Sequence, residues 1–469
     1  MGFKKTTRPR PFLMDMTLED LNYGLEGDFF TSTDLVRSYL KRIQEVNHIV
    51  RAIAELDPAA LDQAKAFDAE RLAGISGSWN SSSHLVFCMH IPLHGIPIIL
   101  KNQFATHNMN NTSGSTALFG AKTGRDTAVV KRLRDAGVIT LEIPQWLAMA
   151  GNGWSADGGQ SVGIFFENQD PWGSSTGPAI GTALGLAFAG LGTEVEGSIT
   201  CVAERSNLIG LKPTVGLVSR DLVILSRRLG SIGPLTRCVM DAAATLTAIA
   251  GKCPNDPATN AIPFEIIPDY TKACKLDGLN ALKGNPPCAE LTSFVSKEFE
   301  AYVEVLRELG ATVVDDCCFE GYEDALKKQY RFRGNKAMEN AWDFFDNREC
   351  EEFKAALEYM ERLAHGGGVQ GALEKNRLDA LILPTCVSPI VPAPGGYPII
   401  TVPLGVYPED SEIKMCPRGD MIERGPNLPF GLSFIGKKFS EEKLIKYACS
   451  FEQQTQRRKK GRPILAPKT

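Results

Sequence analysis

The chain has 469 residues, of which 43% are hydrophobic and 23% charged, which excludes a wholly disordered, collagenous or coiled-coil protein. Its 51 Lys and Arg and 55 Asp and Glu leave a net charge of −4, so no overall field favours nucleic acid or an anionic membrane. The 12 cysteines include no C-x-x-C pair and the first residues include no apolar signal-peptide stretch, so we expect a cytoplasmic protein with reduced thiols.

Residues 1–83 are predicted to form an N-terminal helical part. Ser32 or Thr33 can cap a helix whose apolar residues recur at helical spacing. The segment RAIAEL at residues 51–56 is typical of a short strand.

Residues 84–251 alternate short apolar runs with helical patterns, which predicts an α/β core around a central sheet. GIPIIL at residues 95–100 is the first buried strand. A helix is expected to start at Asp126, and residues 138–141 form the next strand.

No charged residue lies between Asp170 and Glu194. Only about 14 residues of this stretch are apolar, fewer than the ~18 that a membrane-spanning helix needs. We therefore expect one buried helix here, with Pro178 at its first helical position.

Residues 252–376 are more helical and more charged, and we interpret them as a variable helical cover. Residues 377–469 return to strands and end in a helix capped by Ser440. The three predicted strands of this part are residues 378–384, 398–404 and 429–436. The basic run Arg457–Arg462 is interpreted as a solvated tail beyond the last helix.

One short motif suggests an α/β-hydrolase. GSSTG at residues 173–177 fits G-x-S-x-G and would make Ser175 a nucleophile. That fold needs a histidine downstream, and only His365 follows, next to three glycines at an expected helix end. The residues before Gly173 also make a poor strand, so we do not favour this interpretation.

A lysine offers another proton acceptor. Lys101 ends the buried strand GIPIIL, and loss of solvation there would lower its pKa and populate a neutral amine. Ser174 and Ser198 are candidate partners, and Gly197 would let the backbone N–H groups turn towards a substrate oxygen. Taken one by one, these residues equally suit a surface lysine and ordinary turn serines.

Together, the motifs resemble the amidase signature family, whose members use a Ser-cisSer-Lys triad. Ser174 and Ser198 are 24 positions apart, as in family members, and an acid at Glu196 is similar to the fungal-type branch. The resemblance covers nearly the whole chain. In chain order, the motifs are GIPIILK (95–101), GSSTG (173–177), GTEVEGSIT (192–200), LIGLKPTVG (208–216), GPLTR (233–237), YPIITVPLG (397–405) and LPFGLSFIG (428–436).

The resemblance implies a serine amidase. Ser198 would attack an amide carbonyl, Ser174 in a cis peptide would relay the proton, neutral Lys101 would receive it, and Ser175 would support the loop. No metal or organic cofactor is implied. The backbone N–H groups expected to form the oxyanion hole are those of Val195, Glu196, Gly197 and Ser198.

The family fold implies one α/β amidase domain over residues 1–469, with a central mixed β-sheet flanked by α-helices. The expected partner is a small-molecule amide, with neither nucleic acid nor a membrane. The sequence leaves a homodimer open.

Several positions depart from the family pattern. Glu194, Glu196 and Thr200 replace an Asp, a Gly and an Arg around the nucleophile, so the usual Asp–Arg pairing is missing. The carboxylate of Glu196 could select against anionic substrates. Asn102-Gln103 replaces Asp-Asn after the lysine, and the segment 278–371, which helps to build the acyl pocket in this family, is short.

Two alternatives to hydrolysis stay open. The same acyl-enzyme could pass its acyl group to an amine or alcohol in a biosynthetic pathway, because only the second substrate differs. A non-catalytic relative that binds a ligand or partner would also explain the altered nucleophile loop.

Overall fold

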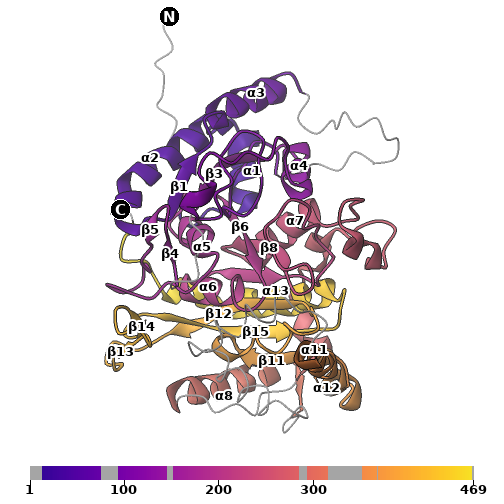
Figure 1. Cartoon of the computed structure of the whole chain (residues 1–469). Helices are drawn as coiled ribbons and strands as arrows, with labels where there is room; N and C mark the ends of the chain where they lie inside the picture. Colours follow the sequence, from indigo (N-terminus) through magenta and orange to yellow (C-terminus); the bar gives the residue numbers. More distant parts are fainter. Residues whose placement is uncertain are drawn as a thin grey trace, which may run out of the picture.

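The computed structural model describes residues 13–74, 93–144, 152–284, 293–314, 351–366 and 368–466. Nine strands within these ranges form one mixed sheet through the middle of the molecule (Figure 1), and helices pack on both sides of it. This is the α/β architecture that the sequence predicts.

The sheet has the strand order β1-β3-β2-β6-β8-β7-β12-β15-β11. Strand β2 pairs in parallel with β3 and β6, and the other pairings are antiparallel. Its strands are β1 (Ile53–Leu56), β2 (Pro97–Leu100), β3 (Ile139–Pro144), β6 (Ala189–Glu194), β7 (Ile209–Lys212), β8 (Ser231–Thr236), β11 (Leu381–Pro384), β12 (Ile399–Val406) and β15 (Pro429–Ile435). The short pairs β4 (Trp154–Ser155) with β5 (Gly159–Gln160), β9 (Lys283–Gly284) with β10 (Thr312–Val313), and β13 (Lys414–Met415) with β14 (Ile422–Arg424) lie outside it.

The helices surround this sheet. They are α1 (Leu18–Glu26), α2 (Ser32–Val50), α3 (Ala60–Leu72), α4 (Ala128–Asp135), α5 (Thr176–Ala183), α6 (Thr200–Arg205), α7 (Val239–Ile249), α8 (Ser293–Glu308), α11 (Glu351–Ala364), α12 (Val369–Lys375) and α13 (Glu441–Thr455). Across the described residues, none of these helices has the length and apolar character needed to cross a bilayer.

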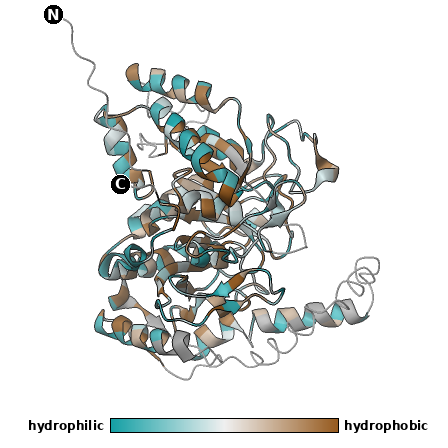
Figure 2. Cartoon of the chain, turned by 90° about the vertical axis from the view of Figure 1, so that its left-hand side faces the viewer, coloured by the Kyte–Doolittle hydropathy of each residue, from teal (hydrophilic) through white to brown (hydrophobic). Residues whose placement is uncertain are grey.

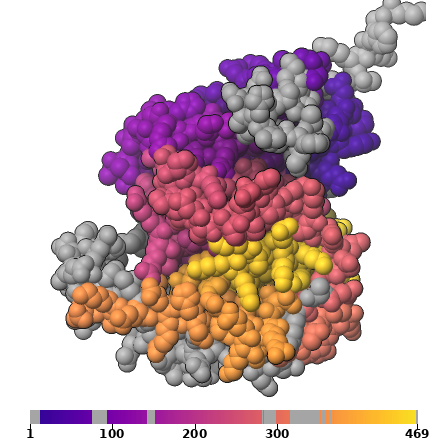
Figure 3. Space-filling model, turned by 90° about the vertical axis from the view of Figure 1, so that its right-hand side faces the viewer, coloured from indigo at the N-terminus to yellow at the C-terminus, as the bar shows by residue number. Residues whose placement is uncertain are grey.

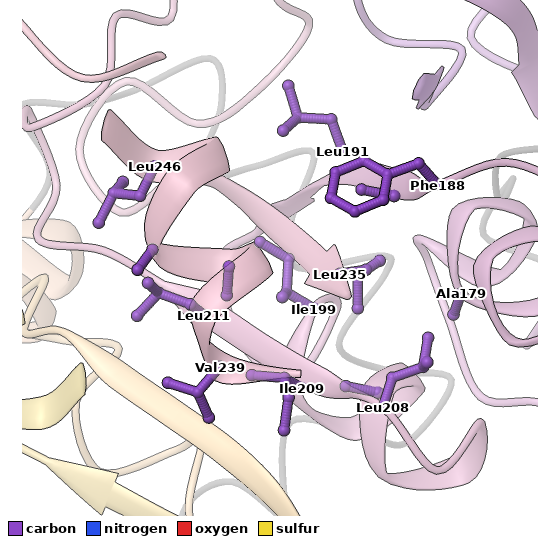
Figure 4. Packing of buried hydrophobic residues seen from close by; sticks show 14 of the residues in the cluster. Ala179, Phe188, Leu191, Ile199, Leu208, Ile209, Leu211, Leu235, Val239 and Leu246 are labelled. Atoms are coloured by element: carbon purple, nitrogen blue, oxygen red, sulfur yellow. The ribbon is translucent and has the colours of Figure 1, made fainter. Parts of the chain in front are cut away.

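The central strands are buried on both faces. Every residue of β6, β7 and β8 is buried, as expected for strands covered by helices on each side. Figure 4 shows side chains from several segments gathered around them, among them Leu191, Ile199, Leu235 and Leu246. This packing fixes the strand ends that carry the candidate site.

The C-terminal helix closes the core over a long distance in the sequence. Helix α13 contacts α7 as well as β12 and β15. Figure 3 shows these last residues, in yellow, between the red segment near residue 250 and the orange segment near residue 400.

The N-terminal helices are amphipathic, and one cap differs from the prediction. In Figure 2, hydrophobic and hydrophilic residues alternate along the outer helices. The cap of α2 is Thr31, whose side chain and Asp34 form a reciprocal capping box, and not Ser32 or Thr33. Ser32 and Thr33 instead donate their backbone N–H groups to Asp68.

The uncharged stretch is not one helix. Helix α5 starts at Thr176, two residues before Pro178, and ends at Ala183. Gly185 has a φ of 67°, and a Cβ there would lie 3.0 Å from the backbone of Leu13, so the chain turns where only glycine fits. It then forms β6, a central strand that the sequence analysis missed.

The C-terminal part contains the three predicted strands as β11, β12 and β15. Ser440 precedes α13 but does not cap it with its side chain, because the Ser440 hydroxyl donates to the carbonyl of Lys437 at 2.7 Å. The basic run is not a solvated tail. Arg457 lies over the ring of Tyr302 at 4.5 Å, and Arg458 pairs with Asp15, so this segment packs against the fold. The segment 278–371, which the sequence predicts to be short, is only partly described, because residues 285–292, 315–350 and 367 lie outside the described residues.

Candidate active site

Two neighbouring parallel strands carry the site. Strands β2 and β6 pair in parallel, so their carboxyl ends lie at the same edge of the sheet. Lys101 directly follows β2, and its N–H donates to the carbonyl of Leu191 on β6 at 3.0 Å. The pairing therefore brings Lys101 next to Thr193, near the end of β6.

Lys101 is fully buried and surrounded by oxygen atoms. Its Nζ lies 2.6 Å from Ser174 Oγ, 2.9 Å from Thr193 Oγ1 and 3.5 Å from the carbonyl oxygen of Thr193. Burial holds the pKa of Lys101 well below its usual range, and the charge of Glu194 opposes this shift only in part. Burial therefore favours the neutral amine over the ammonium, the direction that the sequence predicts.

The double-serine loop leads into α5. The peptide bond between Gly173 and Ser174 is cis, the geometry that the family resemblance implies for this serine. Ser175 is fully buried: its Oγ accepts from the N–H of Thr193 and donates to the carbonyl of the same residue, both at 3.2 Å. Its own N–H donates to the carbonyl of Ser198 at 3.2 Å, which joins the two serine segments.

The nucleophile candidate lies in the turn between β6 and α6. Gly197 has a φ of 75°, and a Cβ there would lie 3.0 Å from Cys201 Sγ and 3.4 Å from Trp172 Nε1. Within the described part of the chain, no hydrogen bond occupies the N–H groups of Gly197 and Ser198 or the Ser198 hydroxyl. Ser198 is half-buried and Gly197 is buried, so the Ser198 side chain is the part of this turn that is open to a ligand in the structure.

Glu194 shapes this turn from inside. Its buried carboxylate accepts from the N–H groups of Ile199 at 2.6 Å and Thr200 at 2.8 Å, and from the Thr200 hydroxyl at 3.1 Å. The Asp–Arg pairing of the family pattern is thus replaced by a glutamate that reaches the backbone and a threonine that donates to it. Glu196, by contrast, is exposed.

Sequence reasoning missed one member of the site. Thr193 touches Lys101 through its side chain and Ser175 through its backbone, so it joins the predicted site residues. It lies inside the motif GTEVEGSIT, five residues before Ser198, but nothing in a single sequence marks which residue of a strand faces a lysine.

The α/β-hydrolase interpretation finds no support in this geometry. His365 lies at the end of α11, and its Nδ1 is 3.4 Å from Gln370 Oε1. The hydroxyl of Ser175 is engaged by the Thr193 backbone and has no histidine partner among the described residues.

The chain is similar to several known amidases. The family model described as Amidase matches residues 34–368. A putative amidase of Arthroderma benhamiae is 37% identical over 98% of this chain and 88% of its own length, and a probable amidase of Arabidopsis thaliana is 32% identical over 95% and 91%. The solved structure of a peptide amidase from Stenotrophomonas maltophilia is similar with a TM-score of 0.81, at 30% identity over 97% of this chain and 99% of that one.

Proposed function

The chain belongs to the amidase signature family, and from this premise we propose that it hydrolyses a carboxamide C–N bond through an acyl-enzyme on Ser198. The observation that carries the proposal is the 2.6 Å distance between the buried Lys101 Nζ and Ser174 Oγ, in a loop that hydrogen-bonds to Ser198. A neutral amine in that position can take a proton relayed from the nucleophile.

In the first half of the proposed reaction, Ser198 Oγ attacks the amide carbonyl. Its proton passes to Ser174 Oγ, and the proton of Ser174 passes to Lys101 Nζ, which becomes an ammonium. When the tetrahedral intermediate collapses, the proton returns along the same path to the leaving nitrogen. The amine departs and an ester on Ser198 remains.

The oxyanion of this intermediate would lie against the turn after β6. We assign its stabilisation to the backbone N–H groups of Val195, Glu196, Gly197 and Ser198. The left-handed conformation at Gly197 and the Glu194 carboxylate behind Ile199 and Thr200 support this assignment, since they hold the turn open on its substrate side.

In the second half, water replaces the amine. The proton of the attacking water passes through Ser174 to neutral Lys101. When the acyl C–O bond breaks, a proton returns along the same path to Ser198 Oγ, which releases the carboxylic acid and restores the free serine. An amine that competed with water would give transfer in place of hydrolysis, so product analysis separates the two outcomes.

We propose an uncharged carboxamide as the substrate class. The exposed carboxylate of Glu196, next to the proposed oxyanion hole, disfavours an anionic group there. The similarity to a peptide amidase over 97% of the chain makes peptide amides the first substrates to test.

The test is mass spectrometry after treatment with a fluorophosphonate, followed by ammonia release from peptide amides. We expect label on Ser198 in the wild type, and loss of both labelling and hydrolysis in Ser198→Ala and Lys101→Met. Ser450→Ala is the matched control, because Ser450 is also buried but bonds to Leu276 in a distant part of the fold.

Full activity in folded Ser198→Ala or Lys101→Met would refute the mechanism. Label on Ser175 in place of Ser198 would revive the α/β-hydrolase interpretation. Absence of label together with absence of ammonia release would favour a non-catalytic relative.

A further inference from the structure

Gln103 lies two residues beyond Lys101 and is almost fully buried. Its Nε2 contacts the backbone carbonyl of Ile224, and the N–H of Ile224 donates to the Gln103 carbonyl at 3.4 Å. A carbonyl oxygen can only accept, so the amide nitrogen must face Ile224 and Oε1 must face the other way. The orientation of the Gln103 amide is thus fixed by the chemistry of its partner.

The orientation of Gln103 fixes that of the Thr193 hydroxyl. Gln103 Oε1 lies 2.5 Å from Thr193 Oγ1, and because the amide oxygen has no proton, the hydroxyl must donate to it. The remaining lone pairs of Thr193 Oγ1 then face Lys101 Nζ at 2.9 Å. Thr193 can therefore only accept from the lysine.

A neutral lysine amine has two N–H donors and one lone pair. The hydroxyl and carbonyl oxygens of Thr193 are both acceptors and take the two N–H groups, which leaves the lone pair for Ser174. We propose that Gln103 is a positioning residue: through Thr193, it directs the lone pair of Lys101 at the hydroxyl of Ser174. This inference rests on the proposed function, in which that lone pair receives the relayed proton.

The same contacts suit the protonated state. An ammonium has three N–H donors, and the two oxygens of Thr193 and the Ser174 hydroxyl offer three acceptors. The charge of Glu194 influences Lys101; Glu194 is the last residue of β6 and is not part of the Gln103–Thr193 chain. Substitutions of Gln103 by an uncharged residue therefore change the orientation of the relay without adding or removing a charged side chain near Lys101.

The test measures the rate at which a fluorophosphonate labels Ser198, across a range of pH, in the full-length protein. In Gln103→Leu, the Thr193 hydroxyl loses its acceptor and is free to donate to the lysine lone pair, where it competes with Ser174. We expect the rate at the high-pH plateau to fall at least about tenfold. The acid limb should move to lower pH, because a hydrogen bond donated to the neutral amine favours that form.

A double substitution separates this effect from general damage. In Gln103→Leu/Thr193→Val, no hydroxyl remains to compete, so the rate should recover part of the loss seen in Gln103→Leu alone. Thr193→Val alone should lower the plateau of the labelling rate and move its acid limb to lower pH, because the ammonium of Lys101 loses an acceptor. Thr193→Ser, which keeps the hydroxyl, should return the acid limb towards the wild-type position. Thr245→Val, a buried threonine that bonds within α7, is the matched control and should label like the wild type.

Normal labelling of the wild type with an unchanged plateau in Gln103→Leu would overturn this inference alone. An acid limb of Gln103→Leu that moves to higher pH would also overturn it, because that shift is expected when water enters around Lys101. A double variant whose fold-loss in labelling rate equals the product of the two single losses would overturn it as well. If Gln103→Leu does not fold, the inference is tested by comparing the acid limbs of the labelling rate in Thr193→Val and Thr193→Ser. Acid limbs at the same pH in these two variants would overturn it. Absence of label in the wild type would overturn the proposed function, and this inference with it.

Discussion

Lys101 makes the proposed reaction dependent on pH in a definite direction. Burial lowers the pKa of Lys101, so the neutral amine that accepts the proton is present above that lowered pKa and is lost below it. We expect the rate of Ser198 labelling to rise with pH, and the midpoint of this rise to lie well below the ordinary pKa of a lysine. A limb near pH 10, measured with the same fluorophosphonate, would show that the lysine is solvated or uninvolved.

Ser175 is buried beside the relay, and its contacts predict a supporting role. Ser175→Ala removes the hydroxyl that bridges the N–H and carbonyl of Thr193, leaving a buried N–H without its partner. We expect unfolding by urea to show a loss of about 1–3 kcal/mol, with Ser198 still labelled, although more slowly. Complete loss of labelling in a Ser175→Ala protein of unchanged stability would contradict this role.

Among the elements, the turn between β6 and α6 has the strictest backbone requirement. Gly197→Ala places a Cβ in a left-handed conformation and 3.0 Å from Cys201 Sγ, in the middle of the proposed oxyanion hole. We expect labelling of Ser198 and amide hydrolysis to fall by about 10²-fold or more, while circular dichroism shows a folded protein.

Gly419→Ala is the control for that substitution. Gly419 has a φ of 76°, nearly the same as Gly197, but a Cβ there would meet no atom within 4 Å. It should therefore show the backbone strain of about 1–2 kcal/mol without a loss of activity. Equal losses of activity in the two variants would mean that strain alone explains the effect.

The elements also show what a single sequence can predict. The sequence predicts strand β2 because its four residues, PIIL, are apolar and include two β-branched isoleucines. Lys101 follows them directly. Strand β6, with the sequence AGLGTE, has no β-branched residue before Thr193 and begins inside an alanine- and glycine-rich helix pattern. The sequence pattern therefore assigns its first residues to that helix and predicts no strand after them. Its conformation is set by pairing with β2 (residues 97–100) and β8 (residues 231–236), both of which are distant from β6 in the sequence. A pattern within the β6 segment cannot show these pairings.

The same limit applies to the site. Lys101, Ser174 and Ser198 could be predicted because each lies in a motif of its own. Thr193 and Gln103 could not, since their roles depend on which strands are neighbours and on the Ile224 carbonyl, 121 residues from Gln103.

At the scale of the whole molecule, the mixed sheet encloses several acids behind the site. Glu204 lies in the last turn of α6, and its Oε1 accepts from the N–H of Gly431 on β15 at 2.9 Å. Burial raises the pKa of Glu204 to about 7, and the charge of Arg205 opposes the shift only in part. The site helix and the C-terminal strands thus meet at a carboxyl that titrates near neutral pH.

A raised pKa in the folded state ties stability to pH with a fixed sign. Glu204 binds its proton more tightly in the folded protein, so its contribution to stability is complete below about pH 4.5 and is lost as the pH rises towards about 7. Glu204→Gln keeps an oxygen for Gly431 and removes the titration. The difference in unfolding free energy between pH 5 and pH 8 should therefore shrink by on the order of 3 kcal/mol.

The measurement is urea unfolding of the wild type and Glu204→Gln at both pH values, with Glu409→Gln as the control. Glu409 is exposed, so its substitution should leave the pH dependence unchanged. Glu452, whose pKa burial also raises to about 7, stays in all variants, so part of the wild-type pH dependence should persist in Glu204→Gln. If Glu204→Gln keeps the full wild-type difference, the Glu204 carboxyl does not titrate near neutral pH in the folded protein, and the contact between α6 and β15 is insensitive to pH.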